Sequence, residues 1–324
     1  MLNNRDEVLK LLDGVRERAD DYFIPLGGHD TGTQAKKDIS NLTGTLYNHL
    51  PLVKAIVDAA AGLPVYAGYD GKDVETRNGT YTDNLILLHE PADESTLSFI
   101  HAYTHELVHL DQDRRGLLRE HSPVPPSHNM VDYLAHNLIL EAAAFATEAV
   151  SLYYISERSS LNEVDDEVEG YFDEYGATLP PNVFIRDLIE TSLEGKRGKD
   201  FHSLKPAWQV AFQSFFEPDS AYVANYLKQF TQVYLNKFLK DETELQKDAP
   251  PADWGSAAML RDITTMTGWG PMFPQGAIPV LLRTIRAAVV QEKHLPMIDV
   301  VRTHVWEREP SARNIARFLS GPSF

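Results

Sequence analysis

The sequence predicts an α+β fold that is mainly α-helical, with a small β-sheet and additional helices in its C-terminal part. Apolar residues recur with helical period over most of the chain. Short extended, apolar segments are found between residues 64 and 88. The 324 residues are 43% hydrophobic, so they can bury a large core in one or two domains.

Three helices are expected before residue 64, near residues 3–19, 34–48 and 51–61. Pro51 suits the first turn of the third helix, because the N–H that proline lacks has no helical partner there. Gly62 and Pro64 then end the helical pattern.

The β segment is predicted to start with Pro64–Gly68 and to continue as a hairpin. Val74–Arg77 and Thr80–Leu88 flank the dipeptide Asn78-Gly79. Asn-Gly between two extended runs indicates a type I′ turn, because both central residues of that turn need positive φ. The apolar run over residues 84–88 is expected to be the best-buried strand.

After Pro91 the sequence returns to helical period. Asp93 or Ser95 can cap a helix that continues past His109. Prolines exclude regular helix from residues 117–130, and a long helix follows near 131–157. Further helices are predicted near 183–193, 203–215, 219–240, 256–265, 276–292 and 311–319.

Charge and composition exclude several classes of protein. The net charge is −17, from 30 Lys and Arg against 47 Asp and Glu. Such a surface repels nucleic-acid phosphates and anionic membranes, so neither is an expected partner. The chain has no cysteine, which excludes disulfides, thiolate metal sites and cysteine nucleophiles. Any metal must therefore be bound by His, Asp or Glu.

Localisation is predicted from what the sequence lacks. The N-terminal segment is charged and amphipathic, without the apolar core of a signal peptide. No window approaches the roughly 20 apolar residues of a membrane span. We therefore expect a cytoplasmic protein, with signal-independent export as the alternative.

The segment His105-Glu106-Leu107-Val108-His109 matches the pattern HExxH. Residues four apart share a helix face, so His105 and His109 can present their imidazoles to one zinc ion. Glu106 is rotated by about 100° from His105, which puts its carboxylate beside the metal. From there it can act as catalytic base for a zinc-bound water, whose pKa zinc lowers to about 7.

The third ligand has to come from another part of the chain. His101 lies about 12 Å along the helix axis from His109, too far for both to bind one ion. We expect it to line the site or to lie in the second coordination shell; the alternative is a polar surface position. Gln112 and Arg115 break the longer HExxHxxGxxH signature. Glu141 lies on an apolar stripe of the 131–157 helix, where a carboxylate is costly unless it is paired or binds a metal. We predict Glu141 as the third ligand.

Glu148 lies two turns further on the same stripe. It is predicted to orient a ligand imidazole from the second coordination shell. The alternative is that Glu141 forms a salt bridge to a neighbouring helix and Glu148 faces water. The residue that would stabilise an oxyanion has no signature: Tyr103, His128, Tyr133 and His136 are candidates by proximity in sequence.

HExxH on one helix with a glutamate ligand on a later helix resembles the gluzincin class of zinc metallopeptidases. Residues 105–112 (HELVHLDQ) and 141–144 (EAAA) are similar to a bacterial group of uncharacterised metallopeptidases with HExxHxxQ and a later EADA, whose Asp is replaced by Ala143 here. The resemblance covers roughly residues 60–155. It implies a zincin-like core, with a small sheet beside the active-site helix and the ligand helix packed behind. A break in the sequence pattern near residues 195–200 divides the chain into a predicted metallopeptidase domain over 1–195 and a helical C-terminal region over 196–324; a single domain is the alternative.

The function predicted from these observations is hydrolysis of peptide bonds, with a peptide or protein as substrate and Zn²⁺ as cofactor. Two alternatives remain at this point. One is a catalytically inactive, zinc-binding interaction module of zincin type. The other is a helical adaptor in which HExxH is coincidental. A serine hydrolase is disfavoured because G-x-S-x-G is missing, and no phosphate-binding glycine loop occurs.

Overall fold

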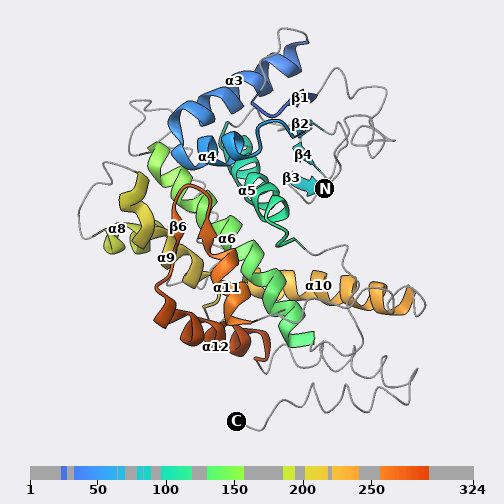
Figure 1. Ribbon diagram of the computed structural model, residues 1–324, viewed down its shortest axis with the longest axis vertical. Helices are drawn as coiled ribbons and strands as arrows, with labels where there is room; N and C mark the ends of the chain where they lie inside the picture. Colours follow the sequence, from blue (N-terminus) through green and yellow to red (C-terminus); the bar gives the residue numbers. More distant parts are fainter. Residues whose placement is uncertain are drawn as a thin grey trace.

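A small sheet and two helices lie at one end of the computed structural model, and the remaining helices surround the long helix α6 (Figure 1). The helices are α3 (Gln34–His49), α4 (Pro51–Ala59), α5 (Thr96–Arg114), α6 (Met130–Ser156), α8 (Ile185–Ser192), α9 (Lys205–Ser214), α10 (Ala221–Lys240), α11 (Ala257–Ile263) and α12 (Ile278–Val289), with the 3-10 helices η1 (Phe201–Leu204) and η2 (Gln275–Ala277). The structure describes residues 23–27, 33–63, 65–69, 79–82, 84–88, 96–118, 130–156, 185–193, 201–217, 221–240 and 256–291.

The predicted α+β class is confirmed, and most predicted helices lie within a few residues of the observed ones. Local signals account for several helix starts. The side chain of Thr33 accepts a hydrogen bond from the N–H of Lys36 and so caps α3. Pro51 occupies the first turn of α4, as its missing N–H favours. The helices predicted near 3–19 and 311–319 lie outside the described residues.

The main sheet has four strands in the order β1-β2-β4-β3. They are β1 (Phe23–Pro25), β2 (Tyr66–Tyr69), β3 (Gly79–Thr82) and β4 (Leu85–Leu88). β2 and β4 pair in parallel, whereas β1 and β3 pair antiparallel to their neighbours. β4 is central and β3 is an edge strand that lies against α5.

The predicted position of the hairpin is wrong. The predicted single strand over residues 80–88 is two strands, β3 and β4. They pair with each other antiparallel, with Thr82 opposite Leu85. Asn84, with φ of 72°, supplies the left-handed conformation at this turn, which asparagine tolerates better than most residues. Gly79 lies within β3 and is not among the residues of positive φ. The predicted strand over residues 74–77 lies outside the described residues.

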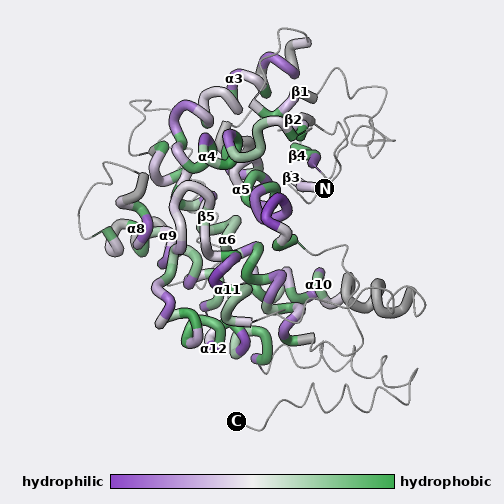
Figure 2. Tube along the Cα trace, viewed as in Figure 1, coloured by the Kyte–Doolittle hydropathy of each residue, from purple (hydrophilic) through white to green (hydrophobic). Residues whose placement is uncertain are grey.

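Helix α6 is the centre of the hydrophobic core. It contacts α5, α8, α9, α10, α11 and α12. Hydrophobic residues predominate along it in Figure 2. The expectation that no segment is apolar enough for a membrane span is wrong by length and composition alone, because Val131–Ile155 meets that test; 89% of its apolar window is, however, buried inside the protein. The surrounding helices therefore account for its hydrophobicity.

Both predicted parts of the chain contribute to this core. Apolar residues from Ile24 to Val289 form a single cluster of buried side chains. The helices α9, α10, α11 and α12, which follow residue 196, pack directly on α6. The division at residue 195 stays a prediction.

A two-stranded hairpin, β5 (Thr265–Met266) and β6 (Gly270–Pro271), is attached to the C-terminal end of α5. The carboxylate of Asp111, fully buried, accepts hydrogen bonds from Arg114 at 2.9 Å and from the hydroxyl of Thr267 at 2.6 Å. Arg115 pairs with its other oxygen at 3.0 Å. These contacts fix the last turns of α5 relative to the C-terminal helices.

Candidate metal centre

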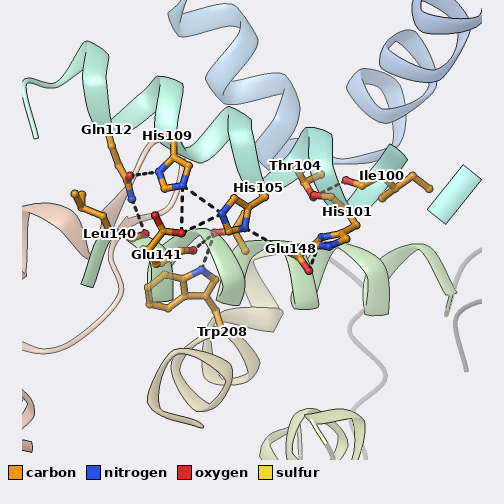
Figure 3. A network of polar contacts seen from close by, with 12 residues as sticks. Ile100, His101, Thr104, His105, His109, Gln112, Leu140, Glu141, Glu148 and Trp208 are labelled. Carbon is orange, nitrogen blue, oxygen red and sulfur yellow. Dashed lines mark hydrogen bonds and ion pairs between the residues drawn. The ribbon is translucent and has the colours of Figure 1, made fainter. Parts of the chain in front are cut away.

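The helices α5 and α6 lie side by side and direct three potential metal ligands toward one point (Figure 3). The Nε2 atoms of His105 and His109 are 3.2 Å apart. Oε2 of Glu141 lies 3.3 Å from the first and 3.6 Å from the second. In the described part of the chain, these three residues form the group whose ligand atoms are close enough to hold one metal ion. Their predicted convergence is confirmed.

The spacing of the three atoms agrees with a tetrahedral ion. Ligand atoms about 2.0–2.1 Å from a zinc ion, at tetrahedral angles, lie about 3.3–3.4 Å from one another. The observed separations of 3.2, 3.3 and 3.6 Å average close to that value. The three side chains are 11–15% exposed, so an ion and a small part of a substrate can reach them.

The tautomer of His109 follows from Gln112. The side-chain N–H of Gln112 donates to the backbone carbonyl of Leu140 at 3.1 Å, which turns the amide oxygen toward the ring. That oxygen lies 2.8 Å from Nδ1 of His109, so Nδ1 must carry the proton. In the neutral ring, Nε2 then presents a lone pair to the metal position.

Glu148 sets the tautomer of His105 in the same way. Its carboxylate accepts a hydrogen bond from Nδ1 of His105 at 3.1 Å. Its other oxygen lies 2.8 Å from Nδ1 of His101. Glu148 is 1% exposed, and its contacts with the two histidines lower its pKa although burial alone would raise it. Glu148 thus lies behind His105, and His101 lies behind Glu148, away from the three ligand atoms.

The three ligand atoms are therefore all hydrogen-bond acceptors when both rings are neutral. Two lone pairs and a carboxylate oxygen at 3.2–3.6 Å repel one another unless a cation lies between them. Burial would lower the pKa of His105, but its contacts with Glu141 and Glu148 raise it well above the ordinary value. When no metal is present, these contacts favour the protonated form of His105.

Glu141 is strongly favoured in its ionised form. Burial alone would raise its pKa, but the attraction of His109 and hydrogen bonds with both histidines lower it far below the ordinary value. The carboxylate is therefore available as an anionic ligand at any physiological pH.

Glu106 lies beside the cluster and not in it. Its side chain is 7% exposed and borders strand β3, where the backbone N–H of Tyr81 hydrogen-bonds to the carboxylate. Burial raises the pKa of Glu106, and the nearby His105 and His109 partly oppose that rise. A carboxylate with a raised pKa, next to the metal position, is suited to accept and release a proton.

Tyr226 is the residue at the site that the sequence did not indicate. It comes from α10, 85 residues beyond Glu141 by their numbers (226 − 141), and its hydroxyl hydrogen-bonds to the Glu141 side chain. Burial and the negative charge of Glu141 raise its pKa well above the ordinary value, so the phenol stays protonated and remains a donor. Its ring packs between Phe215, at 5.9 Å, and Phe230, at 5.6 Å. No motif surrounds Tyr226, so only tertiary contacts could identify it.

Three of the candidates named for the oxyanion are buried in the protein. Tyr103 and Tyr133 are 1% and 2% exposed, within the hydrophobic core. His136 is fully buried, with Nε2 at 3.1 Å from the carbonyl oxygen of Leu117. His128 lies outside the described residues.

Comparison with known proteins gives no further guide to the site. No family model, no curated protein and no solved structure matches the chain. The resemblance to gluzincins accordingly stays a prediction, and the function has to be inferred from the geometry of the site.

Proposed function

We propose that this protein is a zinc-dependent hydrolase that cleaves peptide bonds. The observation that carries the proposal is the group of three convergent acceptors, His105, His109 and Glu141, with the carboxylate of Glu106 directly beside it. A purely structural metal site has no need of a buried base next to the ion, whereas a hydrolase needs one.

Zinc fits this set of ligands better than calcium or magnesium. Two imidazoles and one carboxylate match the ligand types and the number of protein ligands that catalytic zinc takes, with a fourth position left open. Calcium and magnesium prefer sites made of oxygen ligands alone. Gln112 and Glu148 hold the imidazoles by their Nδ1 atoms, as second-shell partners do in zinc enzymes.

The chain's own residues supply the proton transfers. A bound zinc ion would provide Lewis acidity toward water and the substrate carbonyl. Glu106 accepts the proton of the attacking water and passes it to the leaving amine. Its raised pKa favours the first of these steps, because a carboxylate with a higher pKa is a stronger base toward water. Tyr226, a protonated donor at the edge of the site, would stabilise the oxyanion that forms at the carbonyl by turning its single O–H from Glu141 to that oxygen.

The proposal is tested by measuring zinc content and peptide cleavage in the same preparations. After dialysis we expect about one zinc per chain in the wild type, as the three-residue ligand set implies. A pool of unstructured peptides of varied sequence, analysed by mass spectrometry, reports cleavage at any bond that the protein accepts. Glu106→Gln should keep the zinc and abolish cleavage, because an amide cannot accept the proton.

The same measurements separate the alternatives. Stoichiometric zinc with no cleavage by the wild type would support an inactive zinc-binding module. Absence of zinc from the wild type, with no uptake when zinc is added, would support a helical adaptor and refute the proposal.

A further inference from the structure

Strand β3 lies so close to Glu106 that a side chain at its first position, Gly79, would require the glutamate to shift. A Cβ atom added to Gly79 would lie 3.1 Å from Cγ and 3.3 Å from Oε1 of Glu106, and 3.2 Å from Cβ of Ala102. The φ of Gly79 is not positive, so glycine is not needed here for the backbone conformation. Its role here is close approach, because a Cβ at this position would press against the glutamate side chain.

Two residues along the strand, Tyr81 contacts Glu106 through its backbone. In an edge strand, the N–H group of one residue points toward the neighbouring strand and that of the next residue points toward the open edge. The N–H of Tyr81 faces the open edge, and there it binds the Glu106 carboxylate. The backbone of β3 thus offers the carboxylate both space and a donor.

The side chain of Tyr81 anchors this part of the strand to α5. Its hydroxyl donates to Oδ2 of Asp113 at 2.7 Å and accepts from the backbone N–H of Asn84 at 3.2 Å. Asp113 lies two turns beyond Glu106 on the same helix. The strand therefore lies close to α5 at Ala102 and is hydrogen-bonded to it at Asp113, on either side of Glu106 along the helix.

We propose that strand β3 positions the Glu106 carboxylate for catalysis, with Gly79 leaving room for it and the backbone N–H of Tyr81 binding it. The catalytic meaning of this role rests on the proposed function, whereas the contact itself does not. A glutamate has several rotatable bonds, and a base must be held close to one geometry to be efficient. Gly79 and Tyr81 act through Glu106 and are positioning residues.

Hydrogen exchange tests the contact without any substrate. In the zinc-free protein, the amide of Tyr81 should be protected in the wild type and in Glu106→Gln, whose amide oxygen still accepts the hydrogen bond. In Glu106→Ala its exchange should be faster by about tenfold or more, as expected for loss of a hydrogen bond to a charged group. The amides of Thr80 and Thr82, which face β4, should exchange alike in all three proteins. Equal exchange of Tyr81 in all three would overturn the proposal.

A glycine substitution tests the consequence for activity. Gly79→Ala should lower the rate of peptide cleavage by roughly 10- to 100-fold, because small displacements of a reacting group are costly. Its zinc affinity should match that of the wild type, since no ligand moves. Gly276→Ala is the matched control: its added Cβ meets nothing within 4 Å, and cleavage should be unchanged.

The outcomes distinguish this inference from the proposed function. If the wild type binds no zinc and cleaves nothing, the proposed function fails, and the exchange of Tyr81 still decides whether β3 holds Glu106. If the wild type cleaves peptides and Gly79→Ala cleaves them equally fast, the positioning role is wrong although the enzyme is real. Should Gly79→Ala fail to fold, the comparison of Glu106→Gln with Glu106→Ala decides alone.

Discussion

Gln112 connects His109, a proposed metal ligand on α5, to the backbone of α6. Its replacement by methionine tests the interpretation of the site most sharply. Methionine has a similar length and no hydrogen-bonding amide. It would remove the acceptor 2.8 Å from Nδ1 of His109 and the donor 3.1 Å from the carbonyl oxygen of Leu140. Gln112 is fully buried, so water does not readily replace either bond.

Two separate losses are expected. Leaving the Nδ1–H of His109 buried without an acceptor should lower the free energy of unfolding of the zinc-free protein by about 1–3 kcal/mol. Loss of the group that orients the ligand ring should weaken zinc binding by about 10- to 100-fold, which corresponds to about 1.4–2.8 kcal/mol.

Thr147→Val is the matched control for stability. Thr147 is 2% exposed, and its hydroxyl accepts a hydrogen bond at 2.9 Å from the indole of Trp208 on α9, a contact that does not involve α5. The variant loses a buried hydrogen bond of the same kind, also worth about 1–3 kcal/mol, without touching a metal ligand.

The assay combines urea unfolding in the presence of a chelator with competition for zinc against a chelating dye. Both variants should be destabilised, and only Gln112→Met should bind zinc more weakly. If Gln112→Met binds zinc as tightly as Thr147→Val, the argument that Gln112 sets the tautomer of His109 is refuted.

Three further predictions concern the ligands and Tyr226. Glu141→Gln should lose its zinc on dialysis while remaining folded by circular dichroism, because a neutral amide is a poor replacement for an anionic ligand; retention of zinc would argue against Glu141 as a ligand. Tyr226→Phe should lower kcat by about 100-fold or more if its hydroxyl stabilises the oxyanion, with a smaller effect on zinc affinity; an unchanged kcat would exclude that role. In the zinc-free protein, burial lowers the pKa of His105, but Glu141 and Glu148 outweigh that effect and raise the pKa above its ordinary value. The protonated form of His105 therefore stabilises the folded state. This stabilisation is complete below about pH 6.5, the ordinary pKa of the unfolded chain, and is lost as the pH rises through the higher pKa of the folded protein. The melting temperature of the zinc-free protein should therefore fall over that range, and the increase caused by zinc should grow with pH, as paired thermal melts can show; a stabilisation by zinc that shrinks with rising pH would contradict the assignment.

The sequence could predict the parts of the site that depend on local geometry. The spacing of four between His105 and His109 places them on one helix face, whatever surrounds the helix. Glu141 could be found because a carboxylate interrupts an apolar stripe whose other members, such as Leu138 and Phe145, are buried in the structure. The same periodicity predicted α5 and α6 to within a few residues.

The hairpin shows where local signals mislead. Asn78-Gly79 has the composition of a type I′ turn, yet Gly79 is a strand residue and the turn lies at Asn84. A glycine can serve positive φ or close approach, and sequence alone does not distinguish the two. Here the space that Gly79 leaves is occupied by Glu106, from a helix 27 residues later by their numbers (106 − 79).

The sequence by itself determined the helical class, the pair of histidines, the glutamate beside them and the acidic residue that joins them. Helical period and the cost of burying charge act over a few turns of chain, so a sequence carries them. Only the tertiary structure decided that the Leu140 carbonyl orients Gln112, that α10 brings Tyr226 to Glu141, and that β3 lies over Glu106. These contacts join segments whose separation along the chain carries no periodic signal. They depend on how the helices pack around α6, and that packing is set by the summed shapes of many side chains.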